Sequence, residues 1–188
     1  ISIWHQVDEI TNLSPSNVLE IGPGPGILKN ILCAFGIQIK TLDLDPNLNP
    51  DYLGTATKIP ICNEEFDVCC AFQMLEHLPF DESKIAFSEM IRVSKKYIII
   101  SLPDAEKLWP YSFYIPYLGS FFYNLKKPYF KLKKHEFDGQ HYWELNKKNY
   151  AIDNVIDQLM SISDQIRLIK SFRVKENPYH HFFIFKKF

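Results

Sequence analysis

Apolar and polar positions along the chain follow two alternating patterns. Short continuous apolar runs, typical of strands buried on both faces, are separated by stretches in which apolar residues recur every three or four positions, as on one face of a helix. The apolar runs cover residues 18–21, 66–72 and 97–103. Residues 37–44 also read as a strand, a short strand is expected near Tyr52-Leu53, and the helical stretches cover residues 1–15, 27–35 and 81–94. Strands that alternate with helices predict a doubly wound parallel sheet.

Two helix details can be tested. In the leading helix, Trp4, Val7 and Ile10 are spaced to share one apolar face. At the start of the helix over 81–94, Asp81 is a candidate N-cap, because its carboxylate can accept from free backbone N–H groups of the first turn.

The C-terminal part predicts a helix and then a pair of strands. Residues 146–160 carry an apolar stripe, and residues 166–174 and 181–185 read as strands separated by Asn177-Pro178. Because the connection is too short for a crossover helix, these two strands should form an antiparallel hairpin. The fold class is therefore α/β: a mostly parallel sheet of about seven strands with a C-terminal antiparallel hairpin, in a single domain over 1–188.

Residues 103–145 break the alternation of strands and helices. The segment is rich in proline and in aromatic residues, and it holds a group of lysines: Lys126, Lys127, Lys131, Lys133 and Lys134. Because it follows a strand of the parallel sheet, it should overhang the carboxyl ends of the strands, as a lid over an acceptor site. The lysines fit a solvated face, an anionic acceptor, or a membrane surface that also meets the aromatic residues.

A glycine-rich loop follows the first buried strand. Glu20 precedes a run in which Gly22, Gly24 and Gly26 alternate with prolines, and a helical pattern begins at Ile27. Glycines allow positive φ angles and a close approach of ligand to backbone, and the following helix points its N-terminus at the loop. The pattern therefore predicts a binding loop at the carboxyl end of the strand.

The spacing of the glycines limits which class of ligand the loop can bind. A dinucleotide fingerprint would place its third glycine at Ile27, and a P-loop would need Gly-Lys-Ser/Thr, so neither pattern is met. Glu20 would repel a pyrophosphate, whereas its carboxylate can accept from an ammonium group. Glu-x-Gly-x-Gly-x-Gly resembles the first motif of the class I S-adenosylmethionine (SAM)-dependent methyltransferases, of the type 11 kind. The resemblance implies that SAM is the cofactor and that Glu20, Gly22, Pro23, Gly24 and Gly26 hold its methionine end.

The next two strands end in further candidates for cofactor binding. Asp43 lies about twenty residues beyond the glycine loop, the separation at which a carboxylate can take both ribose hydroxyls, and Leu44 follows it. Asp45, next to Pro46, is the competitor and reads more simply as a turn residue. Gly54 to Pro60 resembles the adenine segment of the same family, which implies that Thr55 and Ala56 contact the adenine. The family usually has Asp where this chain has Thr55.

The buried run over 66–72 leads into Gln73-Met74-Leu75-Glu76-His77-Leu78, which also resembles the family. Ligands bind outside the carboxyl ends of parallel strands, so Phe72, Gln73 and Met74 should border the amino-acid side of the cofactor. His77 could act as a base, and the alternative is an orienting or packing histidine.

Two histidines and three carboxylates lie within His135-Glu136-Phe137-Asp138-Gly139-Gln140-His141-Tyr142-Trp143-Glu144. A neutral imidazole can take the proton of a hydroxyl or phenol acceptor, with His141 as the first candidate, His135 as the second, and Glu144 as the group that orients either. Structural hydrogen bonding is the alternative for each of them. No metal site is predicted, because the spacing matches no usual one.

Composition narrows the partners. The formal net charge is −1, which provides no basic field for nucleic acid. The four cysteines form no C-x-x-C pair and indicate reduced thiols in a cytoplasmic protein, and no signal sequence or apolar run of transmembrane length is visible.

The sequence therefore predicts a methyltransferase that moves a methyl group from SAM to an oxygen, or else a carbon or nitrogen, of a small or lipid-like acceptor. Peripheral membrane contact through the lysine and aromatic insertion is a further expectation, and the oligomeric state is not predicted. One alternative is a non-catalytic SAM- or nucleotide-binding module that uses the insertion for a protein or membrane partner. Another is an NAD-dependent oxidoreductase, against which the displaced third glycine, Glu20 and the closing hairpin all count.

Overall fold

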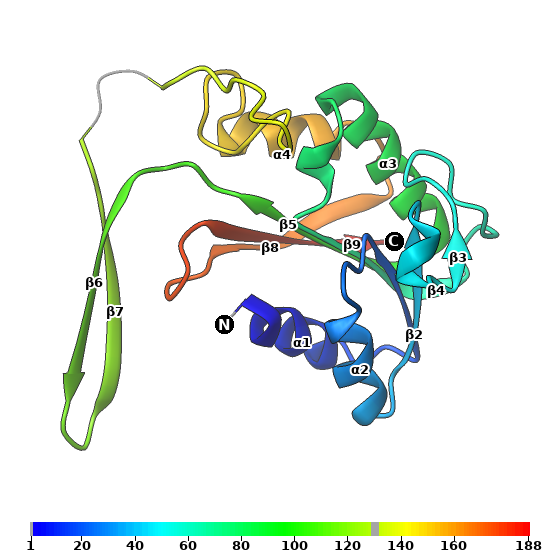
Figure 1. The fold of residues 1–188 in the computed structure, drawn as a ribbon, viewed down its shortest axis with the longest axis horizontal. Helices are drawn as coiled ribbons and strands as arrows, with labels where there is room; N and C mark the ends of the chain where they lie inside the picture. Colours follow the sequence, from blue (N-terminus) through cyan, green and yellow to red (C-terminus); the bar gives the residue numbers. More distant parts are fainter. Residues whose placement is uncertain (1, 129–131) are drawn as a thin grey trace.

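A computed structural model describes residues 2–128 and 132–188 (Figure 1). Tyr129, Phe130 and Lys131 of the insertion lie outside the described residues. The elements in chain order are α1 (Ser2–Asn12), β1 (Asn17–Ile21), α2 (Ile27–Ala34), β2 (Gln38–Asp43), η1 (Pro46–Leu48), β3 (Tyr52–Leu53), β4 (Phe66–Phe72), η2 (Leu75–His77), α3 (Phe80–Val93), β5 (Ser94–Pro103), β6 (Leu108–Ile115), β7 (Gly119–Lys126), α4 (Ile152–Met160), β8 (Ile166–Arg173) and β9 (His180–Lys187).

Seven strands form one sheet in the order β3-β2-β1-β4-β5-β9-β8. The strands β1 to β5 run parallel, whereas β9 runs antiparallel to both β5 and β8. This arrangement confirms the predicted fold class, including the C-terminal antiparallel hairpin. It also separates the sheet from an ordinary all-parallel dinucleotide fold.

The core lies in two layers, one on each face of the sheet. The helices α1 and α2 cover one face, and α3 and α4 cover the other (Figure 1). Successive residues of β4 pack alternately into the two layers. Val68 and Cys70 pack toward α1 and α2, while Cys69 and Ala71 pack toward α3 and α4. Every residue of β4 is buried, as its unbroken apolar run predicted.

Three details of the helices differ from the expectations. Trp4 is exposed and does not share the apolar face of α1; Glu9 is buried instead, and it pairs with Lys170 at 2.6 Å. Asp81 is not an N-cap, because the cap position is Pro79 and Asp81 lies in the first turn of α3. The helix over 146–160 begins only at Ile152, since Asn146 and Asn149 adopt positive φ angles that a helix cannot contain.

The insertion contains a β-hairpin that extends away from the seven-stranded sheet (Figure 1). Its strands β6 and β7 form their own antiparallel sheet, and most of their side chains are exposed. The later part of the insertion returns to the core, where Trp143 is buried and its indole N–H donates to Ser83 Oγ at 3.1 Å. Whether the segment covers an acceptor stays a prediction. Among the described residues, no helix has the length and apolarity needed to cross a membrane.

Candidate functional site

The glycine loop after β1 has the backbone that its sequence predicted. The φ angles of Gly22, Gly24 and Gly26 are 67°, 53° and 72°, all in the left-handed region. A Cβ on Gly22 would lie 2.7 Å from Met74 Cγ, so the loop and the end of β4 touch at this point. Only glycine combines this conformation with this close approach.

A cavity of about 310 Å³ opens at the glycine loop. Its walls include Glu20, the loop itself, Phe72 and Gln73, as the sequence predicted, and also Ile3 and Gln6 of α1. The contribution of α1 was not expected, because nothing in its periodicity shows which part of the sheet it covers. The predicted loop residues and the end of β4 thus face one hollow at the carboxyl edge of the sheet.

Glu20 is a buried carboxylate in the wall of this cavity. Its side chain is buried, and Oε2 has no hydrogen-bond partner within the part of the chain that the structure describes. Burial raises the pKa of Glu20 from 4.5 to about 8, with only a small opposing effect from the charge of Lys29. A buried acceptor without a donor is costly, and a cationic ligand with N–H groups would satisfy it.

The two candidate aspartates at the end of β2 make different hydrogen bonds. Asp45 Oδ1 accepts from the N–H of Asn47 at 2.9 Å and caps the short helix η1, so Asp45 is the turn residue. Asp43 is half-buried, and its Oδ1 accepts from the N–H of Asp45. Leu44, between them, is exposed.

The loop after β3 runs beside Asp43. The N–H of Gly54 donates to the carbonyl of Asp43 at 3.0 Å, which brings Thr55 and Ala56 next to the end of β2. The Thr55 hydroxyl lies 3.3 Å from the Thr57 hydroxyl, and Ala56 packs on the core. The assignment of this loop to the adenine stays a prediction.

Asp51, which the sequence analysis did not single out, connects α2 with β2. Asp51 pairs with Lys29 of α2 and with Lys40 of β2, and it accepts from both the N–H and the hydroxyl of Thr41. Although partial burial opposes ionisation, these donors lower the pKa of Asp51. The contacts tie the start of α2, and with it the loop, to the edge of the sheet.

The turn after β4 is strained. Gln73 has a φ of 52°, and it is held by its N–H, which donates to the carbonyl of Ser101 at 2.9 Å. Its side-chain amide also reaches Ser101 Oγ at 3.3 Å. A non-glycine residue with positive φ persists only where the surrounding structure enforces it, and such positions concentrate at functional sites.

A second polar cluster lies next to this turn and joins distant parts of the chain. Glu76 and His77 of η2 meet His141 of the insertion, and the rings of His77 and His141 are 5.0 Å apart. Glu76 is completely buried, and burial, with a smaller effect from the charge of Glu144, raises its pKa to about 8. Nothing in the sequence indicated a role for Glu76, because only its neighbour His77 stood out.

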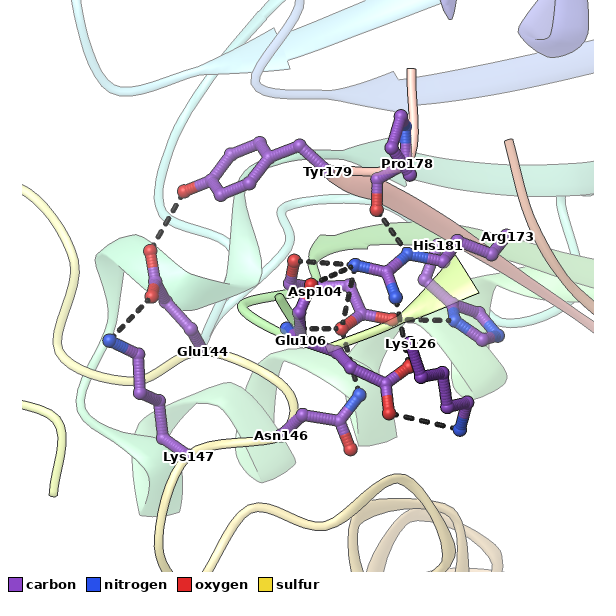
Figure 2. Close-up of polar contacts among 10 residues, drawn as sticks. All are labelled: Asp104, Glu106, Lys126, Glu144, Asn146, Lys147, Arg173, Pro178, Tyr179 and His181. Carbon is purple, nitrogen blue, oxygen red and sulfur yellow. Dashed lines mark hydrogen bonds and ion pairs between the residues drawn. The ribbon is translucent and has the colours of Figure 1, made fainter. Parts of the chain in front are cut away.

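Glu144, the carboxylate of the predicted histidine–carboxylate pair, contacts several polar side chains. His141 Nδ1 lies 3.2 Å from Glu144 Oε1, which also accepts from the hydroxyl of Tyr179 at 2.8 Å. Lys147 lies 3.5 Å from the other carboxylate oxygen, and Figure 2 shows Tyr179 and Lys147 on opposite sides of Glu144. Burial opposes ionisation, but the bonds from Tyr179 and His141 outweigh it and lower the pKa of Glu144.

His135 belongs to the same cluster. Its Nε2 lies 2.8 Å from the carbonyl of His141, and its Nδ1 lies 3.7 Å from Glu144 Oε2. The structure therefore brings together the two histidines that were predicted to remove a proton and Glu144, which was predicted to orient them. Their catalytic role stays a prediction.

A buried network anchors the insertion where it leaves β5 (Figure 2). Asp104 pairs with His181 at 3.2 Å and with Arg173 at 3.3 Å, and it accepts from the side-chain amide of Asn146 at 2.8 Å. Arg173 also pairs with Glu106 at 3.0 Å. These contacts join both ends of the insertion to the β8–β9 hairpin, and sequence reasoning missed them because the partners lie far apart in the chain.

Comparisons with known proteins agree with this geometry. Residues 19–100, which include β2 to β4 and most of β1 and β5, match the family described as a methyltransferase domain. A curated relative, ribosomal RNA small subunit methyltransferase A from Phytoplasma australiense, is 26% identical over an alignment of 93 residues that covers 43% of this chain. The match spans only 33% of that relative's length.

Solved structures share the fold. A SAM-dependent methyltransferase from Clostridium acetobutylicum has a TM-score of 0.61 at 10% identity, with 98% of this chain and 90% of that chain covered. The 1,6-didemethyltoxoflavin-N1-methyltransferase from Burkholderia thailandensis, solved with its substrate and S-adenosylhomocysteine, has a TM-score of 0.62 at 13% identity, with 94% and 73% covered. Residues 19–100 thus match a methyltransferase-domain family, and the chain as a whole shares its fold with solved SAM-dependent methyltransferases.

Proposed function

We propose that the protein transfers a methyl group from SAM to an oxygen atom of a small or lipid-like acceptor. The observation that carries this proposal is the buried, unpaired carboxylate oxygen of Glu20 in the cavity at the glycine loop. Because β1 and β4 are adjacent and parallel, Glu20 and the turn after β4 lie at the same edge of the sheet. The His141–Glu144 pair lies next to that turn, where His141 meets Glu76 and His77. A cofactor site and a proton-accepting cluster side by side are what a methyl transfer to a hydroxyl requires.

The chain offers a fitting contact for each part of the cofactor. Glu20 accepts from the ammonium group, while the glycine loop, Phe72 and Gln73, which line the cavity, enclose the methionine end, and Met74 follows them. Asp43 takes the ribose hydroxyls, with Thr55 and Ala56 beside it for the adenine. SAM supplies a methyl group already activated on its sulfonium, so the protein mainly has to align the acceptor and exclude water.

The polar cluster supports an oxygen acceptor. A neutral hydroxyl is a poor nucleophile, and it reacts more readily when its proton is removed or its pKa is lowered. His141 is held by Glu144 through Nδ1, which leaves Nε2 free to promote loss of that proton. His135 is the second candidate, although its Nε2 is already bonded to a backbone carbonyl.

The hairpin supports a lipid-like acceptor reached at a membrane surface. Residues 108–125 contain no charged side chain, and the tip residues Tyr117 and Leu118 are exposed. Lys107 and Lys127 lie at the base of the hairpin, where they can meet anionic headgroups while the apolar tip contacts the lipid. A cytoplasmic location stays part of the proposal, and the four cysteines, all free thiols, are consistent with it.

Titration calorimetry with SAM, and separately with NAD, tests the cofactor assignment. We expect micromolar binding of SAM and no binding of NAD. Gly22→Ala should weaken SAM binding at least about tenfold, because the new Cβ meets Met74 and displaces the loop. Gly36→Ala is the matched control: its φ is also positive, at 77°, but a Cβ there meets nothing within 4 Å. Absence of SAM binding at saturating concentration would overturn the proposal.

The exposed hairpin also favours a second candidate, a non-catalytic SAM-binding module that docks on a membrane or a protein. Radiolabelled SAM incubated with a panel of hydroxylated lipids and small phenols separates the two candidates. Label transfer that is lost in His141→Gln supports the enzyme. SAM binding without transfer to any acceptor of the panel supports the module.

A further inference from the structure

The geometry points to a binding site for one divalent transition-metal ion, formed by Glu76, His77 and His141. A carboxylate oxygen of Glu76 and one ring nitrogen of each histidine all lie within 4.8 Å of one another. Three donors that close together can contact a single ion, with zinc-to-nitrogen and zinc-to-oxygen distances of about 2.0–2.2 Å after small side-chain adjustments. This inference replaces the expectation, drawn from spacing alone, that the chain has no metal site.

The hydrogen bonds of His77 and His141 engage the Nδ1 atom of each ring. His77 Nδ1 lies 3.1 Å from the carbonyl oxygen of Gln140, which can only accept, so Nδ1 carries the proton. His141 Nδ1 is engaged by Glu144 at 3.2 Å in the same way. In a neutral ring whose Nδ1 carries the proton, Nε2 is the nitrogen that can bind an ion. A carbonyl or carboxylate behind Nδ1 is the usual support of a metal-binding histidine.

Glu76 provides the independent observation that a ligand is needed here. It is 0% exposed, and neither carboxylate oxygen has a hydrogen-bond partner among residues 2–128 and 132–188. A buried carboxylate without any donor is expensive, and a bound cation would compensate it. Its neighbour Glu144 adds negative charge, of which Lys147 balances part.

A second grouping of possible donors, Asp138 with His141 and Glu144, is explained without an ion. The Asp138 carboxylate is exposed and accepts from the backbone N–H groups of Gln140 and His141. Glu144 already accepts from Tyr179. We therefore assign the ion to Glu76, His77 and His141, with Glu144 as the residue that positions His141.

The donor set indicates which ions fit. Two imidazoles and one carboxylate favour zinc, manganese or iron over magnesium and calcium, which prefer oxygen ligands. Three protein ligands leave coordination positions open for an acceptor oxygen. This part of the inference rests on the proposed function and deepens it: His141 would promote loss of the acceptor proton through the ion it holds, because the ion lowers the pKa of a bound hydroxyl.

Metal binding can be measured without any acceptor. The full chain, freed of metal with a chelator, is titrated with Zn²⁺ by calorimetry and with Co²⁺ by visible absorption. We expect one ion per chain, and a Co²⁺ spectrum that Zn²⁺ abolishes while Mg²⁺ does not. Glu76→Gln and His141→Gln should each weaken Zn²⁺ binding at least about tenfold, and Glu144→Gln should weaken it about 10- to 100-fold.

His5→Gln is the matched control, because His5 lies on α1 and pairs with Glu176, outside the cluster. The thermal melts of the metal-free variants check that they fold, and Zn²⁺ should raise the melting temperature of the wild type and of His5→Gln only. Binding that survives both Glu76→Gln and His141→Gln, or no stoichiometric binding to the wild type, would overturn the inference. SAM titration of the same samples keeps the two ideas apart: failure of Zn²⁺ binding with intact SAM binding removes the metal site alone, and the reverse removes the proposed function alone.

Discussion

The carboxyl edge of the sheet has two sides, here called the cofactor side and the acceptor side after the proposed function, and they are built in different ways. On the cofactor side, Glu20 and the glycines that follow it form one continuous loop, and Asp43 ends the neighbouring strand. On the acceptor side, Glu76, His141 and Tyr179 come from three distant segments: the turn after β4, the end of the insertion, and the turn before β9. The comparison shows that a site made by one loop can be recognised in a sequence, whereas a site made by packing cannot.

The two sides also differ in how they are held. The glycine loop is supported by the sheet directly, through the bond from the N–H of Gly22 to the carbonyl of Leu42. The acceptor side depends on the segment around Trp143, which reaches the core after a long excursion. Changes in the insertion should therefore affect the acceptor side first, and the following predictions test this separation.

The largest effect is expected from Trp143→Ala. Trp143 is buried, donates to Ser83 and packs edge-on against Phe80 at 4.9 Å, so its removal leaves a cavity in the core. The free energy of unfolding should fall by about 3–5 kcal/mol in urea denaturation. Trp109→Ala on the exposed face of the hairpin should cost far less. Equal effects of the two changes would mean that the end of the insertion is not part of the cooperative fold.

Glu20→Gln should alter the pH dependence of the cofactor side. Because burial raises the pKa of Glu20 to about 8, the native state binds its proton more tightly than the unfolded chain does. The free energy of unfolding therefore falls as the pH rises from about 5 to about 8, by up to about 3 kcal/mol for this group. Glu76 contributes a slope of the same sign, so Glu20→Gln should reduce the slope without abolishing it.

Affinity for SAM provides the second measurement on Glu20. The ionised carboxylate is the form that accepts from an ammonium group, so SAM should bind more tightly as the pH rises through the same window. In Glu20→Gln this gain should disappear, whereas Glu82→Gln, an exposed change of the same kind on α3, should keep it. A Glu20→Gln variant that keeps the wild-type pH profile would remove Glu20 from the cofactor site.

Asp43→Ala and Asp45→Ala test the choice between the two aspartates. If Asp43 takes the ribose hydroxyls, its loss should weaken SAM binding about 10- to 100-fold, since hydrogen bonds to a charged group are worth about 1.5–3 kcal/mol. Asp45→Ala removes the cap of η1 and should cost about 1 kcal/mol of stability with little change in SAM affinity. Calorimetry with both variants decides the assignment, and the reverse result would transfer the role to Asp45.

Tyr179→Phe should give the smallest effect and one confined to the acceptor side. It removes the hydroxyl that donates to Glu144 at 2.8 Å, so Glu144 and His141 are held less firmly. We expect kcat to fall a few-fold and the free energy of unfolding to fall by about 1 kcal/mol, with SAM affinity unchanged. Tyr123→Phe, on the exposed hairpin, should change none of these quantities. A loss of SAM affinity in Tyr179→Phe would show that the two sides are coupled.

The sequence by itself determined the sheet and the conformation of the glycine loop. The strands β1, β4 and β5 appear as mainly apolar runs because a strand buried on both faces needs few polar positions, and the closing hairpin follows from a connection too short for a helix. The glycine loop was recognisable because the steric demand on each glycine is local. The boundary of α4 was predicted less well, since the apolar stripe does not show that Asn146 and Asn149 leave the helical conformation.

Only the tertiary structure decided which distant residues meet. The periodicity of α1 placed Trp4 on the apolar face, but Lys170 of β8 made it possible to bury Glu9 there, and α1 came to line the cofactor cavity. Likewise, the sequence offered the histidines of the insertion only a partner within their own segment, Glu144, and packing added Glu76 and His77 next to His141. The physical reason is that the conformation of a loop or strand depends on neighbouring residues, whereas a contact between segments depends on how the whole core packs.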